Sequence, residues 1–106
     1  MKLSDYIIKK ISTYTNYAFT GQGGSVVHLN DSLSKNKKMK IIPAQNEQGA
    51  SLAADAFYRT SGKLGVVVAT SGPGILNTLQ GMACSYYDSI PGLYLSGAPV
   101  TGSIKK

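Results

Sequence analysis

Residues that build metal sites and disulfides are scarce in this chain. Its 106 residues include one cysteine, one histidine and no tryptophan. The single Cys84 cannot form a disulfide within the chain, and its apolar neighbours predict a small buried side chain. The single His28 has no second histidine or cysteine at ligand spacing, which predicts a solvated or capping side chain rather than a metal ligand.

Long hydrophobic runs are also missing. The longest uninterrupted run, Val66 to Ala69, is far below the roughly 18 residues of a membrane-spanning helix. The first residues lack the apolar stretch and the small-residue cleavage site of a signal peptide. We therefore expect a cytoplasmic protein that makes no membrane contact.

Acidic residues are few, with five against eleven lysines and arginines, and the formal net charge is +6. Much of the excess lies between Lys35 and Lys40 and in the terminal pair Lys105 and Lys106. No aromatic residues alternate with these lysines, as they do in many nucleic-acid binders. The pattern predicts a solvated loop and tail, and no nucleic-acid partner.

The remaining sequence alternates between helix and strand patterns within one domain. Short apolar runs predict strands at 17–19, 40–43, 65–70 and 93–96. Asn46 is the expected N-cap of the third helix, Gly62 its stop, and Pro73 the start of the fourth. The small side chains of the third helix would let another helix approach its backbone closely. Apolar residues at helical spacing predict four buried stripes: Leu3, Ile7, Ile11 and Tyr14; Val26, Leu29 and Leu33; Ala50, Ala53, Ala54 and Phe57; and Ile75, Leu79, Met82 and Tyr86.

This alternation predicts an α/β fold, with a parallel sheet that carries helices on both faces. In such a sheet the loops that leave the strands meet at the carboxyl edge, where ligands bind. The predicted loops are 20–24, 44–47, 71–74 and 97–99, and they contain the only glutamate of the chain, Glu47.

The loops lack the known fingerprints for phosphate binding and for a serine nucleophile. No G-x-x-x-x-G-K-[ST] or G-x-S-x-G occurs, and Val26 stands where a G-x-G-x-x-G motif needs its third glycine. For Glu47 the residues leave two interpretations open. It stabilises a helix N-terminus through the helix dipole, or it lies in a crevice opposite Gly72, Pro73 and Gly74 and exchanges a proton with a bound ring.

Three ordered motifs carry a family resemblance. They are N-E-Q-G-A from Asn46, G-V-V-V-A-T-S-G-P-G-x-x-N from Gly65, and Y-x-D-S-I-P from Tyr86. Together they resemble the pyrimidine-binding domain of thiamine-diphosphate enzymes, most of all that of the acetolactate synthase catalytic subunit. The resemblance runs from the first helix through Pro99.

The resemblance implies a catalytic role for Glu47. In the family the matching glutamate hydrogen-bonds the pyrimidine ring of thiamine diphosphate and promotes deprotonation of the thiazolium carbon that attacks a 2-keto acid. The implied activity is decarboxylation of that acid followed by carboligation. The implied cofactor-binding residues are Gly23, Gly24, Glu47, Gln48, Gly72, Pro73, Gly74 and Asn77.

The resemblance also implies parts that this sequence does not contain. In the family a second domain with a G-D-G motif holds the diphosphate and Mg²⁺, and two subunits share the cofactor. We therefore expect a homodimer, or a partner chain that carries the diphosphate-binding domain. Residues 1–106 would then be a truncated N-terminal domain that associates readily and binds little cofactor alone.

Two departures from the family pattern leave the particular 2-keto acid open. Asn46 replaces a usual histidine, and Thr20-Gly21-Gln22 replaces a tyrosine-proline pair ahead of two glycines. An alternative interpretation also stays open, in which the chain is a non-catalytic remnant or interaction module.

Overall fold

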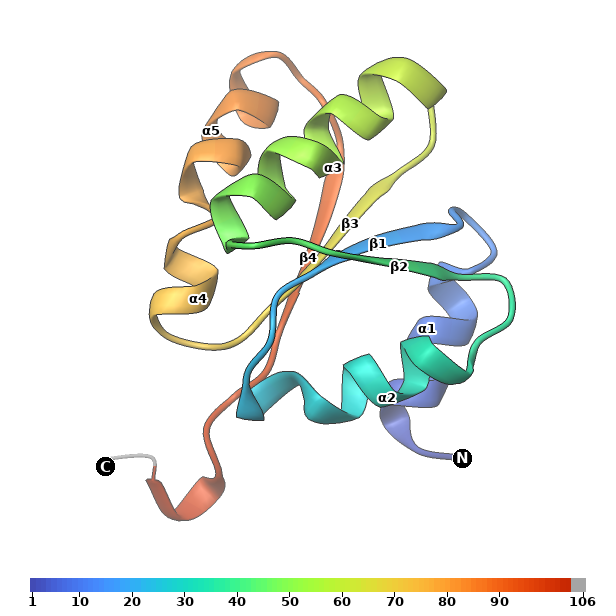
Figure 1. Ribbon diagram of the computed structural model, residues 1–106, viewed down its shortest axis with the longest axis vertical. Coiled ribbons are helices and arrows are strands. Elements are labelled where there is room, and N and C mark those ends of the chain that lie inside the picture. Colours follow the sequence, from blue (N-terminus) through green and yellow to red (C-terminus); the bar gives the residue numbers. More distant parts are fainter. Residues whose placement is uncertain (104–106) are drawn as a thin grey trace.

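A four-stranded parallel sheet forms the centre of the computed structural model, which describes residues 1–103 (Figure 1). Phe19 pairs with Ile42 on one side and with Val67 on the other, so β1 and β3 are the central strands. Every residue of β3 is buried, as its unbroken apolar run predicts. The predicted strands are confirmed to within one residue at each end. The strands are β1 (Tyr17–Thr20), β2 (Lys40–Pro43), β3 (Gly65–Ala69) and β4 (Gly92–Ser96), in the order β2-β1-β3-β4.

Helices cover both faces of the sheet (Figure 1), which confirms the predicted α/β class. One face carries α1 (Leu3–Ile11) and α2 (Val27–Lys35), and the other carries α3 (Glu47–Ser61) and α5 (Leu79–Tyr87). Three short pieces complete the described chain: η1 (Gly24–Val26), α4 (Pro73–Leu76) and η2 (Thr101–Ser103). Within residues 1–103 no helix is long and apolar enough to cross a membrane.

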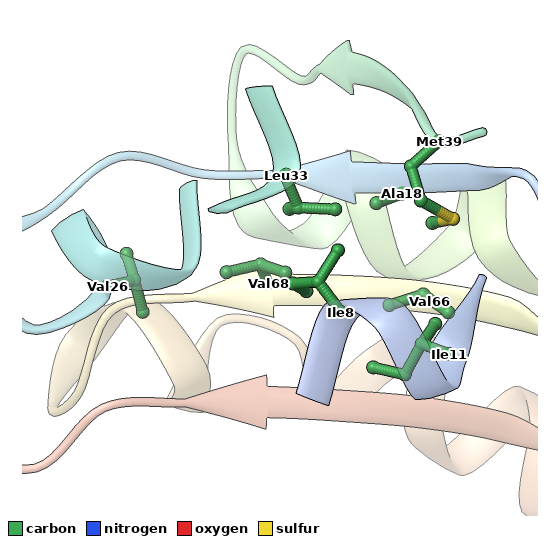
Figure 2. Close-up of a cluster of buried hydrophobic side chains, with 8 residues drawn as sticks. All are labelled: Ile8, Ile11, Ala18, Val26, Leu33, Met39, Val66 and Val68. Carbon is green, nitrogen blue, oxygen red and sulfur yellow. The ribbon is translucent and has the colours of Figure 1, made fainter. Parts of the chain in front are cut away.

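The larger hydrophobic core lies between the sheet and the α1–α2 layer. Figure 2 shows Ile8 and Ile11 of α1 directed toward Val66 and Val68 of β3. Full burial of an aliphatic side chain of this size contributes about 1.5–3 kcal/mol relative to its exposure. The predicted stripe of the second helix is confirmed, since Val26 and Leu33 are buried and Leu29 packs against the same core.

The buried face of α1 differs from the predicted stripe. Ser4, Ile8 and Ile11 are buried, whereas Leu3 is 75% exposed. Tyr14 follows the end of the helix and is also exposed. The reason is a polar contact between the two helices, in which the hydroxyls of Ser4 and Ser32 of α2 are hydrogen-bonded at 2.8 Å, while Ser32 donates its own hydrogen to Asp5 Oδ1 at 2.7 Å. This contact turns Ser4 inward and Leu3 outward.

α3 begins and ends as its sequence predicts. The Asn46 side chain accepts a hydrogen bond from the Gly49 backbone N–H at 2.8 Å, which is the N-cap contact. Gly62 ends the helix with a left-handed φ of 70°, a conformation that disfavours residues with a Cβ. The predicted close approach of a second helix is also confirmed, because Gly81 of α5 packs directly against Ser51 of α3.

The prediction of a single fourth helix is wrong, both in the continuity of the helix and in the face that it buries. It is broken at Asn77 and Thr78 into α4 and α5. Leu79 and Tyr86 are 55% and 84% exposed. The buried positions of α5 are instead Gly81 and Ser85. Small residues are needed there because the backbone of α3 lies so close.

The predictions for the single cysteine and the single histidine have different outcomes. Cys84 lies on α5 and is exposed, so the prediction of a buried cysteine is wrong. The reason is the buried face of α5, on which Gly81 and Ser85 are the buried residues. Cys84 does not lie on that face. His28 is exposed, as predicted for a solvated side chain.

Candidate functional site

The loops that follow the strands meet at the carboxyl edge of the sheet, as the topology predicts. The Gly21 N–H donates to the Val68 carbonyl at 2.8 Å, and the Ala44 N–H donates to the Thr20 carbonyl at 3.0 Å. The loop after β4 joins them, since Gly97 packs against the backbone of Ser25. Backbone contacts therefore fix the relative positions of loops that lie far apart in the sequence.

Two hydroxyl groups link the first and third loops. The Ser25 and Thr70 hydroxyls are hydrogen-bonded at 2.9 Å, and the Ser25 oxygen also accepts from the Ser71 backbone N–H at 2.9 Å. A Cβ at Gly23 would overlap the Thr70 side chain, and one at Gly74 would lie 2.6 Å from its methyl group. Both glycines are thus required by the packing of their loops around Thr70.

Glu47 is the carboxylate at this edge and the first residue of α3. Its negative charge lies at the positive end of the helix dipole, which stabilises it there. The side chain is half-buried, and its Oε2 atom accepts a hydrogen bond from the Asn77 side-chain amide at 3.1 Å. In the described part of the chain, Asn77 is the only hydrogen-bond partner of this carboxylate.

The other carboxylate oxygen, Oε1, lies between two glycines. A Cβ built on Gly21 would be 3.6 Å from Oε1, and one built on Gly74 would be 3.5 Å from it. An open hollow of about 550 Å³ adjoins the carboxylate, within the size range of small-molecule clefts. Its lining residues are Glu47, Pro73, Gly74, Leu76 and Asn77.

The structure brings four of the predicted site residues to this hollow, namely Glu47, Pro73, Gly74 and Asn77. Gly72 is exposed, and its φ of 74° provides the turn into α4. Gly23 lies one loop away, against Thr70, and Gly24 is exposed with no neighbouring atom at its Cβ position. The Gln48 side chain is bonded to Gln80 of α5 and does not line the hollow.

Sequence reasoning missed several residues that shape this edge. Leu76 lines the hollow, Gly21 flanks the carboxylate, and Ser25 and Thr70 hold the two loops together. Ser25 and Thr70 each adjoin a glycine loop, which is the signal that could have identified them. Nothing in the sequence alone marks Gly21 apart from its neighbours Gly23 and Gly24.

The chemistry of the site is that of one carboxylate in a partly apolar hollow. Within residues 1–103 no group of three or more histidine, cysteine, aspartate or glutamate side chains could hold a metal ion. Pro73 and Leu76 offer apolar surface to a flat ring, and Glu47 offers one oxygen to its edge, which accepts a hydrogen bond as a carboxylate and donates one when protonated. This arrangement fits a flat ring whose edge carries a hydrogen-bonding group.

Comparison with known proteins decides the family. The family model described as "Thiamine pyrophosphate enzyme, N-terminal TPP binding domain" matches residues 1–106. The chain belongs to the thiamine pyrophosphate enzyme family. Its fold and its motifs are those of the N-terminal, pyrimidine-binding domain of that family.

Relatives of this thiamine pyrophosphate enzyme domain include acetolactate synthases. The large subunit from Buchnera aphidicola (subspecies Schizaphis graminum) is 41% identical over 76% of this chain and 14% of its own length. The large subunit from Lactococcus lactis is 43% identical over 71% of this chain and 13% of its own. The chloroplastic acetolactate synthase of Arabidopsis thaliana is 34% identical over 74% and 12%. The chain therefore spans only 12–14% of the length of these relatives.

Proposed function

We propose that this chain is the pyrimidine-binding half of an acetolactate-synthase-like enzyme that decarboxylates a 2-keto acid and joins its product to a second molecule. The observation that carries this proposal is the Glu47 carboxylate, which faces an open hollow with one oxygen held by Asn77. Family membership supplies the ligand class, because the matched domain binds thiamine diphosphate.

The residues at the hollow fit the pyrimidine end of this cofactor. A pyrimidine ring has two apolar faces and a polar edge, and the hollow offers Pro73 and Leu76 beside one carboxylate. Gly74 lines the hollow next to Oε1, since a Cβ built on it would lie 3.5 Å from that oxygen. Gly72, Pro73 and Gly74 would hold the ring at the start of α4, with Gly23, Gly24 and Gln48 at the margin of the site.

Thiamine diphosphate, when bound, supplies the electron sink that decarboxylation of a 2-keto acid requires. The contribution of this chain is proton traffic and orientation. Glu47 would hold a proton at Oε1 and exchange it with a ring nitrogen, which is the role of a general acid-base group. Asn77 keeps Oε2 occupied, so that a single oxygen of the carboxylate takes part.

The diphosphate end of the cofactor needs groups from elsewhere. No metal-binding cluster is present among residues 1–103, so Mg²⁺ and the diphosphate would be held by a diphosphate-binding domain outside them. We propose that residues 1–106 act as the N-terminal domain of a homodimer, or with a chain that carries the second domain. A cytoplasmic location is part of the same proposal, although some relatives are chloroplastic.

The test is Glu47→Gln in an assembly that contains the diphosphate-binding half. Turnover of a 2-keto acid should fall by about 10²- to 10⁴-fold, the usual scale for loss of an acid-base group. Asp31→Asn is the matched control, because it also neutralises one carboxylate but lies on α2, paired with Lys2 and Lys35. Equal turnover in Glu47→Gln and the control would remove Glu47 from the mechanism.

The second candidate function is a non-catalytic interaction module. The observation in its favour is that the described residues hold only one end of the cofactor site. An assembly that forms with the diphosphate-binding half, binds no cofactor and turns over no 2-keto acid would support the module over the enzyme.

A further inference from the structure

We propose that Ser25 is a positioning residue: its hydroxyl group supplies the restraint that the glycine loop 20–24 lacks, and so fixes Pro73 and Gly74 beside Glu47. The inference rests on the proposed function, since it assumes that a ring binds in the hollow at Glu47. Ser25 does not line that hollow, so it acts on the ligand only through other residues. No motif singled this serine out.

The glycine loop before Ser25 has little restraint of its own. Residues 20–24 contain three glycines and no proline, so much of the backbone is free of the steric and ring restraints that fix other residues. Gln22 in the middle of the loop is exposed and, within residues 1–103, makes no hydrogen bond. A loop of this composition keeps one conformation only if contacts from outside hold it.

Ser25 is anchored well enough to supply such a contact. It lies in η1 directly before Val26, which is fully buried in the core. Gly97, in the loop after β4, packs directly against the Ser25 backbone. The serine is therefore held from two sides, and its hydroxyl group takes a defined position at the carboxyl edge of the sheet.

The hydroxyl group of Ser25 connects twice to the loop after β3. Its oxygen accepts from the Ser71 backbone N–H at 2.9 Å, and it is also hydrogen-bonded to the Thr70 hydroxyl at 2.9 Å. Thr70 in turn packs against Gly74, because a Cβ on that glycine would lie 2.6 Å from the Thr70 methyl group. One side chain thus fixes the start of the turn that leads to the hollow.

The position of this turn decides the shape of the site. Pro73 and Gly74 line the hollow, and Asn77 at the end of α4 donates to Glu47 Oε2 at 3.1 Å. In the described part of the chain, no other hydrogen bond joins Glu47 to the turn or to α4. A shift of the turn away from Ser25 would therefore change the width of the hollow and the direction of the carboxylate.

The hydroxyl group of Ser25 contributes more to position than to stability. Ser25 and Ser71 are both half-buried, so water can replace the hydroxyl at the Ser71 N–H after Ser25→Ala. The fold then keeps its hydrogen bonds satisfied, whereas the turn loses its tie to the core. Ser25→Ala should therefore alter the site with little change in melting temperature.

Ser32 provides a matched control for Ser25. Its hydroxyl group also bridges two elements, because it is bonded to the Ser4 hydroxyl at 2.8 Å and to Asp5 Oδ1 at 2.7 Å. Ser32 is only 4% exposed, and none of these three residues lines the hollow at Glu47. Ser32→Ala removes the same atom and should lower the melting temperature at least as much as Ser25→Ala.

The experiment compares the two variants by NMR in the isotopically labelled full chain, before and during titration with thiamine, which carries the pyrimidine ring without the diphosphate. Without ligand, relaxation dispersion should show microsecond-to-millisecond exchange at the Ser71 and Gly74 amides in Ser25→Ala only. Thiamine should bind Ser25→Ala about three- to tenfold more weakly than wild type, the loss expected for about one hydrogen bond. Ser32→Ala should bind as wild type does.

Three results would overturn the inference: no exchange in Ser25→Ala, equal exchange in the two variants, or thiamine affinity that Ser25→Ala leaves unchanged. If thiamine does not bind to wild type up to its solubility limit, the proposed function fails. The exchange measurement needs no ligand and still decides whether Ser25 positions the turn.

Gln22→Pro tests whether restraint of the glycine loop is what Ser25 supplies. The φ angle of Gln22 is negative and its N–H makes no hydrogen bond within residues 1–103, so a proline would restrict the loop without removing a contact. Gly23 also packs against Thr70, so a stiffer loop gives the turn a second support. The double variant Ser25→Ala, Gln22→Pro should recover most of the lost thiamine affinity and show less exchange. No recovery of either would overturn the part given to the loop.

Discussion

Asp55 has the most hydrogen bonds of any carboxylate in the described chain, and it lies outside the candidate site. Its oxygens accept from Arg59 Nε at 2.6 Å and from the Ser85 hydroxyl at 2.6 Å, and Arg59 also pairs with Asp88 at 2.6 Å. Asp55 is only 9% exposed. The network joins α3 to α5 and to the turn that follows α5.

Loss of this network should destabilise the fold. We expect Asp55→Ala to lower the free energy of unfolding by about 1–3 kcal/mol, because it leaves a buried Ser85 hydroxyl without its partner. Asp31→Ala is the matched control, since Asp31 pairs with two lysines at the exposed surface and such pairs contribute little. Urea unfolding at neutral pH measures both. Equal losses in the two variants would contradict the role given to Asp55.

Asp55 should also affect how the stability of the fold changes at low pH. The Arg59 guanidinium, and then the Ser85 hydroxyl, lower the pKa of Asp55 below its usual value. A carboxyl whose folded pKa lies below its unfolded value, about 3.9, stabilises the fold above that pH and loses this effect as pH falls through the folded value.

We therefore expect Asp55→Asn to show a smaller fall in melting temperature than wild type between pH 5 and pH 2, measured at high salt. High salt screens the exposed ion pairs of Asp31, whose pKa is also lowered. The pKa of Asp5 is lowered first by the hydrogen bond from the Ser32 hydroxyl, which is present in both proteins and therefore cancels in the comparison. Parallel curves for the two proteins would show that Asp55 does not contribute to acid sensitivity.

Glu47 shows how far single residues could be predicted. Its position at a helix start and its place at the carboxyl edge followed from local signals, namely the Asn46 cap and the strand before it. Its hydrogen bond to Asn77 and the closeness of Gly21 to its Oε1 atom did not follow from local signals. Both depend on distances between side chains of different loops, which sequence spacing does not specify.

At the scale of elements, the contact between α3 and α5 depends on one glycine. A Cβ at Gly81 would overlap the Ser51 side chain and lie 2.7 Å from its backbone carbonyl carbon. Helix propensity alone favours alanine over glycine by about 1 kcal/mol. At position 81 the contact with α3 should reverse this preference, so that alanine gives the less stable protein.

We expect Gly81→Ala to destabilise the fold by about 1–3 kcal/mol, the usual effect of overpacking. Gly49→Ala, also in a helix but exposed, should be neutral or stabilising. Thermal melts of the two variants give the comparison. A gain of stability in Gly81→Ala would mean that α5 can move away from α3 without loss.

The elements also show where sequence patterns succeed. β3 was predictable because a fully buried parallel strand has no alternation, and α3 because Asn46 and Gly62 mark its ends. α5 was not, because its apolar stripe faces outward. The side that packs was selected by the small residues of α3, which is a tertiary effect that no periodicity within α5 reveals.

At the scale of the whole molecule, exposed apolar side chains follow one another along α4 and α5, namely Leu76, Leu79, Tyr86 and Tyr87. Tyr86 and Tyr87 are each 84% exposed, and their rings pack edge to face. Leu76 at one end of this surface also lines the hollow beside Glu47. Exposed apolar surface of this kind promotes association.

We expect the isolated chain to associate at micromolar to millimolar concentration, and the double variant Tyr86→Lys, Tyr87→Lys to do so much less. Tyr6→Lys, Tyr14→Lys is the matched control, because these tyrosines are also exposed but lie near α1. Sedimentation velocity measures the three proteins. An equal reduction of association in both double variants would attribute the effect to the added charge rather than to the α5 surface.

The central claim is that the hollow beside Glu47 binds the pyrimidine ring of thiamine diphosphate. The most direct test maps amide shifts of the wild-type chain during titration with thiamine. The largest shifts should occur at Glu47, Gly74 and Asn77, with binding that is weak because the diphosphate half is not there. Largest shifts elsewhere, for example in the apolar hollow lined by Leu3, Ile7 and Leu29, would contradict the claim.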